Sequence, residues 1–158
     1  MAEPEPPLEE SVRIEAAADD VWDVVSDLRR MGAWGPECVA MHVWRGQVRK
    51  GAWVTGVNRR KLMVWPTTSR IHLCDDRRAI GWTVMENRSR WSYRLTDASD
   101  PGHDATLLTE RRELPDGKSW VGKAFGAVFL GGKTEHDAEL RAGVRTTLAR
   151  IKAAAESR

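Results

Sequence analysis

The strongest constraint on the fold is a change of hydrophobic period along the chain, from two residues to about 3.6 residues. Between Val39 and Leu114, apolar and polar residues alternate in short runs that turn-forming residues separate. Such alternation is typical of strands with one buried face. Because the intervening turns are short, consecutive strands are predicted to pair as an antiparallel sheet. The predicted strands are 9–15, 39–44, 52–61, 63–74, 79–86, 89–96 and 106–114.

A long segment near the C-terminus has helical periodicity instead. It begins near Thr134 and runs to about Ala155, and its apolar side chains recur every three or four residues. The apolar stripe comprises Leu140, Val144, Leu148, Ile151 and Ala155. One face of the sheet needs a cover, and this helix is the only predicted element that is large enough. We therefore expect it to pack across the sheet.

Shorter helices are predicted on both sides of the strand run. Residues 16–28 carry apolar side chains at helical spacing, and 28–32 could form a second short helix before Gly35 and Pro36. Residues 120–130 are rich in small and apolar side chains and could form another. Helices and an antiparallel sheet together predict an α+β fold.

Size and charge limit what the chain can bind. Its 158 residues favour one domain over 9–158, after a disordered tail at 1–8 that is rich in proline and glutamate. A net charge of +2 argues against a dedicated nucleic-acid binder. Basic residues do concentrate between Arg45 and Lys61, with no acid among them. This segment is either a solvated hairpin tip or a site that meets an anionic partner or a membrane surface.

The sequence predicts no metal, no cofactor and no secretion. The first residues are acidic and rich in proline, unlike a signal peptide, and no apolar stretch approaches the length of a membrane span. We therefore expect a cytoplasmic protein without integral membrane contact.

No metal or nucleotide motif is recognisable in the sequence. Cys38 and Cys74 lack metal-ligand spacing, and the histidines are scattered. Gly132-Lys133-Thr134 lacks the upstream glycine of a phosphate loop. The oligomeric state stays open.

Tryptophan is strongly over-represented among the aromatic residues. The chain has eight tryptophans, against two phenylalanines and one tyrosine. Each tryptophan brings a large apolar surface and one N–H donor that needs a partner. Such an excess either fills the core or lines a cavity that a ligand occupies.

Several local patterns follow one another in the order of the predicted elements. They are Ala18-Asp19-Asp20-Val21-Trp22, Trp34-Gly35-Pro36-Glu37, Asn58-Arg59-Arg60, Trp91-Ser92-Tyr93-Arg94-Leu95 and Thr106-Leu107-Leu108-Thr109-Glu110. Together with the element order, they resemble the SRPBCC superfamily of START-like or helix-grip proteins, and its bacterial polyketide cyclase/dehydrase-type members most of all. The resemblance covers about 9–156.

This resemblance implies a helix-grip fold. A curved, seven-stranded antiparallel sheet would wrap around the C-terminal helix, with two short helices after the first strand and a deep apolar cavity between sheet and helix. It implies no particular reaction, because one fold supports many functions. The residues then expected to line the cavity are Trp34, Met41, Trp65, Ile71, Trp82, Trp91, Tyr93, Leu108, Phe125, Phe129, Leu140, Val144 and Leu148. The alternative is that they form an ordinary core.

Two charged residues, Glu110 and Arg112, are the sharpest site candidates. They share strand parity with Leu108, so they are predicted to face the cavity, where a cation such as Arg112 should pair with Glu110. If the parity is displaced by one residue, Arg111 and Glu113 face inward instead.

The sequence leaves three functions open. In the first, the protein binds a small hydrophobic molecule, such as a lipid, a polyketide or an aromatic compound, and Glu110 orients it. In the second, a cyclase or dehydratase acts on a polyketide-like substrate in the same cavity, where substrate folding and water exclusion help the reaction. The acid–base candidates are Glu110, Arg112, Tyr93 and His42. In the third, the basic segment 45–61 binds a partner.

Overall fold

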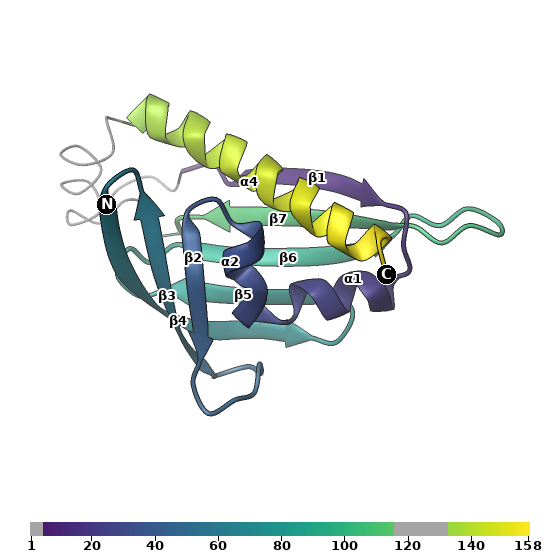
Figure 1. The fold of residues 1–158 in the computed structure, drawn as a ribbon, viewed down its shortest axis with the longest axis horizontal. Helices are drawn as coiled ribbons and strands as arrows, with labels where there is room; N and C mark the ends of the chain where they lie inside the picture. Colours follow the sequence, from purple (N-terminus) through teal and green to yellow (C-terminus); the bar gives the residue numbers. More distant parts are fainter. Residues whose placement is uncertain (1–4, 116–132) are drawn as a thin grey trace.

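A single antiparallel sheet of seven strands, in the order β1-β7-β6-β5-β4-β3-β2, forms the frame of the structure (Figure 1). The structure is a computed structural model that describes residues 5–115 and 133–158. The strands are β1 (Leu8–Ile14), β2 (Cys38–Val43), β3 (Trp53–Arg60), β4 (Met63–Asp75), β5 (Ala79–Val84), β6 (Arg90–Asp97) and β7 (Thr106–Glu113). The predicted sheet is confirmed. Strands that are neighbours in the sheet are also consecutive in the sequence, apart from β1 and β7.

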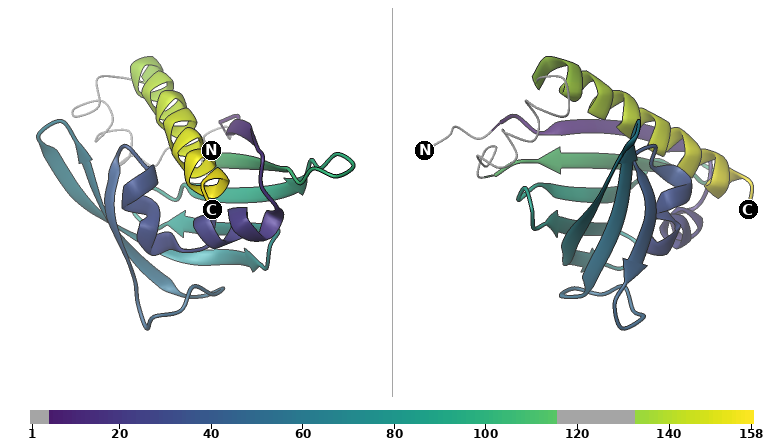
Figure 2. Two further views of the ribbon diagram at one scale, coloured as in Figure 1. Left: turned by 45° about the vertical axis from the view of Figure 1, so that its right-hand side comes forward. Right: turned by 60° about the vertical axis from the view of Figure 1, so that its left-hand side comes forward.

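The helices lie together on one face of this curved sheet (Figure 2). They are α1 (Ala18–Val25), the 3₁₀ turn η1 (Leu28–Arg30), α2 (Met31–Trp34) and α4 (Lys133–Glu156). α4 crosses the sheet diagonally and contacts β1, α1 and α2. This is the helix-grip arrangement that the resemblance implied. No helix in the described residues is long and apolar enough to cross a membrane. The helix predicted over 120–130 lies outside the described residues.

The apolar stripe of α4 forms part of the core, as predicted. Val144, Leu148, Ile151 and Ala155 are all buried, and Leu140 is half-buried near the N-terminal part of the helix. The four buried residues belong to one hydrophobic cluster with inward-facing residues of the sheet and of α1. The sheet and the long helix therefore stabilise each other through a shared core.

Proline at position 66 is tolerated because β4 is longer than its neighbour. β4 pairs with β3 from Met63 onward, but it pairs with β5 only from Ser69 onward. Pro66, which has no N–H to donate, therefore lies in a part of β4 that has an open edge. Of the two places that suit a proline in a strand, an edge or a bulge, Pro66 occupies an edge, and the bulge of β4 lies between Ile71 and Leu73.

The basic segment 45–61 is not one hairpin tip. Arg45 lies in the connection before β3, whereas Lys61 lies in the turn after it, so the full length of β3 separates them. The prediction of a single solvated tip is therefore wrong. Its cations belong to opposite ends of a strand and form no common patch.

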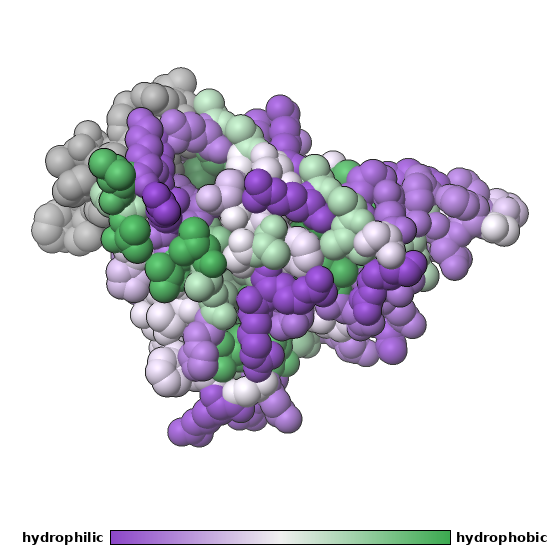
Figure 3. Space-filling model, viewed as in Figure 1, coloured by the Kyte–Doolittle hydropathy of each residue, from purple (hydrophilic) through white to green (hydrophobic). Residues whose placement is uncertain are grey.

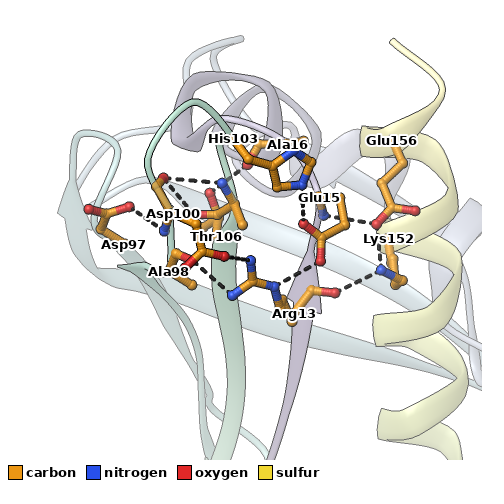
Figure 4. Close-up of polar contacts among 12 residues, drawn as sticks. Arg13, Glu15, Ala16, Asp97, Ala98, Asp100, His103, Thr106, Lys152 and Glu156 are labelled. Carbon is orange, nitrogen blue, oxygen red and sulfur yellow. Dashed lines mark hydrogen bonds and ion pairs between the residues drawn. The ribbon is translucent and has the colours of Figure 1, made fainter.

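The C-terminal end of α4 is fastened to β1 by a polar network (Figure 4). Lys152 Nζ donates to the Arg13 carbonyl at 2.8 Å, and the Glu15 N–H donates to Glu156 Oε1 at 2.9 Å. On its other side, Glu15 Oε2 lies 2.7 Å from His103 Nε2. The network orients one end of α4, while the pocket described below opens near the other end.

Gly32 allows α2 to pack closely against β2. The helical segment passes through Gly32 and ends at Gly35, and Gly32 packs directly on the backbone of β2. A Cβ atom at position 32 would lie 2.4 Å from the Val39 carbonyl oxygen, which is far inside van der Waals contact.

We expect Gly32→Ala to destabilise the protein by about 1–3 kcal/mol, since the added methyl group forces α2 and β2 apart. Urea unfolding monitored by tryptophan fluorescence measures this change. Gly35→Ala is the matched control, because a Cβ atom there would meet nothing closer than 3.4 Å. Equal stability of the two variants would contradict the close contact.

Candidate functional site

A pocket of about 680 Å³ lies between the inner face of the sheet and α4. Its lining combines three tryptophans with a small number of polar and charged side chains. Among the residues that the sequence predicted for the cavity, the pocket includes Met41, Trp65, Trp82, Trp91, Glu110, Leu140 and Val144, and it also includes Arg112. A volume of this size is typical of small-molecule sites, which occupy about 300–1,000 Å³.

Strand parity brings the tryptophans together. Trp82 of β5 and Trp91 of β6 are direct cross-strand partners, so their side chains leave the same face of the sheet at the same level. Trp65 lies on the part of β4 that extends past β5. The three rings therefore form an apolar wall facing the N-terminal half of α4.

Glu110 is a buried carboxyl group in this wall. Its exposed fraction is only 5%, and its Oε2 atom has no hydrogen-bond partner among the described residues. Burial raises the pKa of Glu110 from 4.5 to about 8, and the nearby Tyr93 hydroxyl opposes this rise. Glu110 is therefore mostly protonated at neutral pH and presents an O–H group to the pocket.

The expected ion pair of Glu110 is absent. No cation of the described residues lies within ion-pair distance of its carboxyl group, so that prediction is wrong. The physical reason is that Arg112 lies two residues farther along β7, where its guanidinium packs over the Trp91 ring, 5.8 Å from the ring centre. The inward direction predicted for Glu110 is confirmed by its burial.

Tyr93 supports Glu110 from the neighbouring strand. The two residues are direct partners in the β6–β7 ladder, and Tyr93 is fully buried. Its hydroxyl donates a weak hydrogen bond to Met31 Sδ at 3.7 Å. Burial raises the pKa of Tyr93 well above its usual value, and the charge of Glu110 adds to this rise. Tyr93 therefore keeps its proton and acts as a neutral donor.

Arg112 provides a positive charge beside the tryptophans of the pocket. Burial lowers its pKa, while the charges of Asp137, Glu5 and Glu37 raise it. Because an arginine keeps its proton even so, the pocket holds a permanent cation beside an apolar ring. An anionic or electron-rich group of a ligand would be stabilised at this point.

Charged residues also join the two walls of the pocket. Arg60, at the end of β3, donates from Nε to Glu139 Oε2 of α4 at 2.7 Å, and both residues line the pocket. Glu37 lies beside them, and burial raises its pKa more than the charge of Arg60 lowers it. Figure 3 shows apolar and long hydrophilic side chains side by side at this β3–β4 end, where Leu62 is 97% exposed.

Several residues predicted for the cavity lie elsewhere. Trp34, Leu108 and Leu148 are buried in the core and do not line this pocket, nor does Tyr93. Ile71 is buried in the main core cluster on the inner face of the sheet and does not line this pocket. His42 is exposed and packs edge-on against Trp44, with ring centres 4.7 Å apart, so it lies outside the pocket. Phe125 and Phe129 fall outside the described residues.

Sequence reasoning missed the charged residues that join the walls. Glu37, Arg60 and Glu139 come from a loop, a strand end and a helix, and no local pattern connects them. Ser69 was detectable, because it shares strand parity with Trp65. No group of three or more side chains suited to a metal is present in the described part of the chain.

Comparisons with known proteins give both a family and a fold. A family model described as polyketide cyclase / dehydrase and lipid transport matches residues 6–156. No curated protein matches the chain. A solved structure with 28% identity is the Polyketide_cyc-like protein Cgl2372 from Corynebacterium glutamicum, with a TM-score of 0.59 over 92% of this chain and 88% of that one.

Two more distant structures share the fold. The Zhui aromatase/cyclase from Streptomyces sp. R1128 is 20% identical, with a TM-score of 0.67, and the alignment covers 96% of this chain and 93% of that chain. The di-domain ARO/CYC StfQ from the steffimycin biosynthetic pathway is 14% identical, with a TM-score of 0.72 over 96% of this chain and 50% of that one. At these identities the likeness concerns architecture alone.

Proposed function

The chain belongs to the polyketide cyclase/dehydrase and lipid transport family, and on this premise we propose that its pocket binds a small, largely apolar molecule that carries an oxygen acceptor. The observation that supports this most is the buried Oε2 atom of Glu110, which has no partner among the described residues and faces a pocket of about 680 Å³. A buried polar atom without a partner costs free energy. A ligand oxygen at this position would remove that cost.

The rest of the pocket fits the same kind of molecule. Trp65, Trp82 and Trp91 offer flat apolar surfaces for an aromatic or polyene body. Arg112 lies against Trp91 and would attract a carboxylate, phenolate or enolate group. The ligand class is therefore amphipathic, with an apolar body and oxygen atoms that Glu110 and Arg112 recognise.

A second candidate function, a cyclase or dehydratase, is favoured by the raised pKa of Glu110. A carboxyl group with a pKa of about 8 is a protonated acid at neutral pH and can still lose its proton. Glu110 could donate this proton to a ketone or hydroxyl oxygen of the substrate and recover it in a later step. Tyr93 would hold the carboxyl group in position and keep its own proton.

Tryptophan fluorescence tests the binding function. We expect saturable quenching or a spectral shift with at least one member of a panel of polycyclic aromatics, aromatic polyketides and fatty acids. Three tryptophans line the pocket, so a bound ligand changes their surroundings. A flat response over the whole panel, from protein shown to be folded by circular dichroism, contradicts the proposal.

Two variants of Glu110 separate the two functions. Glu110→Gln keeps a neutral N–H donor, so ligand affinity should stay within a few-fold, whereas Glu110→Leu should weaken it about tenfold or more. If Glu110 transfers a proton, turnover of a converted substrate should fall by about 100-fold or more in both variants. Glu113→Gln is the control, because Glu113 of β7 pairs with Arg111 outside the pocket.

A further inference from the structure

A second concavity, of about 360 Å³, lies on the opposite face of the sheet from the ligand pocket. Four of its lining residues among the described residues are cations, Lys50, Arg70, Arg88 and Arg90, and the lining also includes His72 and the hydroxyl-bearing Thr83. None of these residues lines the first pocket. The concavity is therefore a separate feature of the molecule, and it does not depend on the proposed function.

The register of the sheet concentrates positive charge at one point. Arg70 of β4, Thr83 of β5 and Arg90 of β6 are consecutive cross-strand partners, so two arginines flank one hydroxyl group. Neighbouring strands lie about 4.8 Å apart, so the two arginines leave the sheet roughly 10 Å apart, one on each side of Thr83. No ion pair joins either arginine to an acid of the described residues, and the Arg70 guanidinium packs over the Trp53 ring at 5.4 Å. The register does place one acid, Glu113, directly opposite Arg90.

His72 lines this concavity beside Thr83. Its Nδ1 atom lies 3.0 Å from the Thr83 hydroxyl oxygen, and its ring covers Gly81, where a Cβ atom would lie 3.0 Å from Nε2. Burial lowers the pKa of His72, and the charges of Arg90 and Lys50 lower it further, while Glu113 opposes them. Glu113 is the cross-strand partner of Arg90 and also lies 3.5 Å from Arg111. His72 is therefore a neutral ring in a positive environment.

We propose that this concavity binds a phosphate group, with Arg70, Arg90 and Lys50 as its charged donors and Thr83 as a neutral donor. Three cations around one hydroxyl suit a tetrahedral dianion, because each oxygen can receive its own charge-assisted hydrogen bond. The volume of about 360 Å³ exceeds that of a bare phosphate ion and leaves room for the group to which the phosphate is esterified. A soluble phosphate ester and the headgroup of an anionic lipid share this chemistry.

The first test uses inorganic phosphate with the full-length protein. We expect phosphate to raise the pKa of His72 by about half a pH unit or more, measured by NMR of the imidazole carbons, because a bound anion favours the protonated ring. Chloride at the same ionic strength should leave the pKa of His72 unchanged.

Calorimetry of two arginine variants measures the binding itself. Arg70→Gln and Arg90→Gln should each weaken phosphate binding about tenfold or more. Arg94→Gln, an exposed change on the same strand as Arg90, is the control and should bind like the natural protein.

The second test distinguishes the sources of the phosphate. Co-sedimentation with vesicles that contain phosphatidic acid, lost in Arg70→Gln but kept in Arg94→Gln, identifies a lipid headgroup. Saturable binding of phosphate without co-sedimentation identifies a soluble phosphate ester. If the pKa of His72 responds equally to phosphate and chloride and calorimetry shows no saturable binding, the proposal is overturned. If Arg94→Gln weakens phosphate binding as much as Arg70→Gln does, the attraction is due to general positive charge, and the proposal is also overturned.

Discussion

Leu148→Asp is expected to leave the protein unfolded or insoluble. Leu148 is 2% exposed and lies in the middle of the apolar stripe of α4, within the main core cluster. The substitution removes a packed side chain and places a charge in a core that contains no buried cation among the described residues. Burying an unpaired charge costs several kcal/mol, which is comparable to the roughly 5–15 kcal/mol by which a domain is usually stable. Circular dichroism and the yield of soluble protein measure the effect.

Two companion variants make this result specific. Ala149→Asp places the same charge on the neighbouring, exposed position of α4 and should cost only about 0.5–1 kcal/mol through helix propensity. Leu148→Ala should fold with a loss of about 2–5 kcal/mol, since it leaves a cavity without a charge. If Leu148→Asp melts like Ala149→Asp, α4 does not pack on the sheet through this residue.

Glu110→Gln is expected to remove a large pH dependence of stability. In the folded protein, burial raises the pKa of Glu110 from 4.5 to about 8. The folded state therefore binds this proton more tightly than the unfolded state does, and the contribution of Glu110 to stability is fully present below pH 4.5. Between pH 4.5 and pH 8 the unfolded state loses this proton first, so stability falls as the pH rises. The glutamine variant has no such proton and should lack this decline.

The expected difference between the two proteins is small at pH 4.5 and large above pH 8. Each pH unit between the two pKa values corresponds to about 1.4 kcal/mol, so the full rise in the pKa of Glu110 changes the free energy of unfolding by roughly 4–5 kcal/mol at most. Glu110→Gln should then melt about 10 °C higher than the natural protein at pH 9, given roughly 2–4 °C per kcal/mol for a chain of this length. Scanning calorimetry from pH 4.5 to pH 9 measures this, with Glu113→Gln as the control. Parallel curves across that range would show that Glu110 is ionised in the folded state.

The spacing of apolar residues and their parity along each strand were sufficient to predict the sheet, the long helix and part of the site. The period-two runs determined the strands, because side chains alternate between two faces of a strand and only one face is buried. The stripe from Leu140 to Ala155 likewise determined which side of α4 is buried. Parity with Leu108 also directed Glu110 inward. These are local properties, so neighbouring residues are enough to reveal them.

Contacts between distant segments were decided by the tertiary structure alone. The ion pair of Arg60 with Glu139 joins residues 79 positions apart, and neither residue carries a local signal of it. The absence of a cation at Glu110 depends on where the Arg112 side chain lies in space, and this leaves the carboxyl group neutral. The separation of cavity residues such as Trp82 from core residues such as Leu108 has the same origin. Both kinds of residue are apolar and face inward, and only the distance between sheet and helix determines which of them has space beside it.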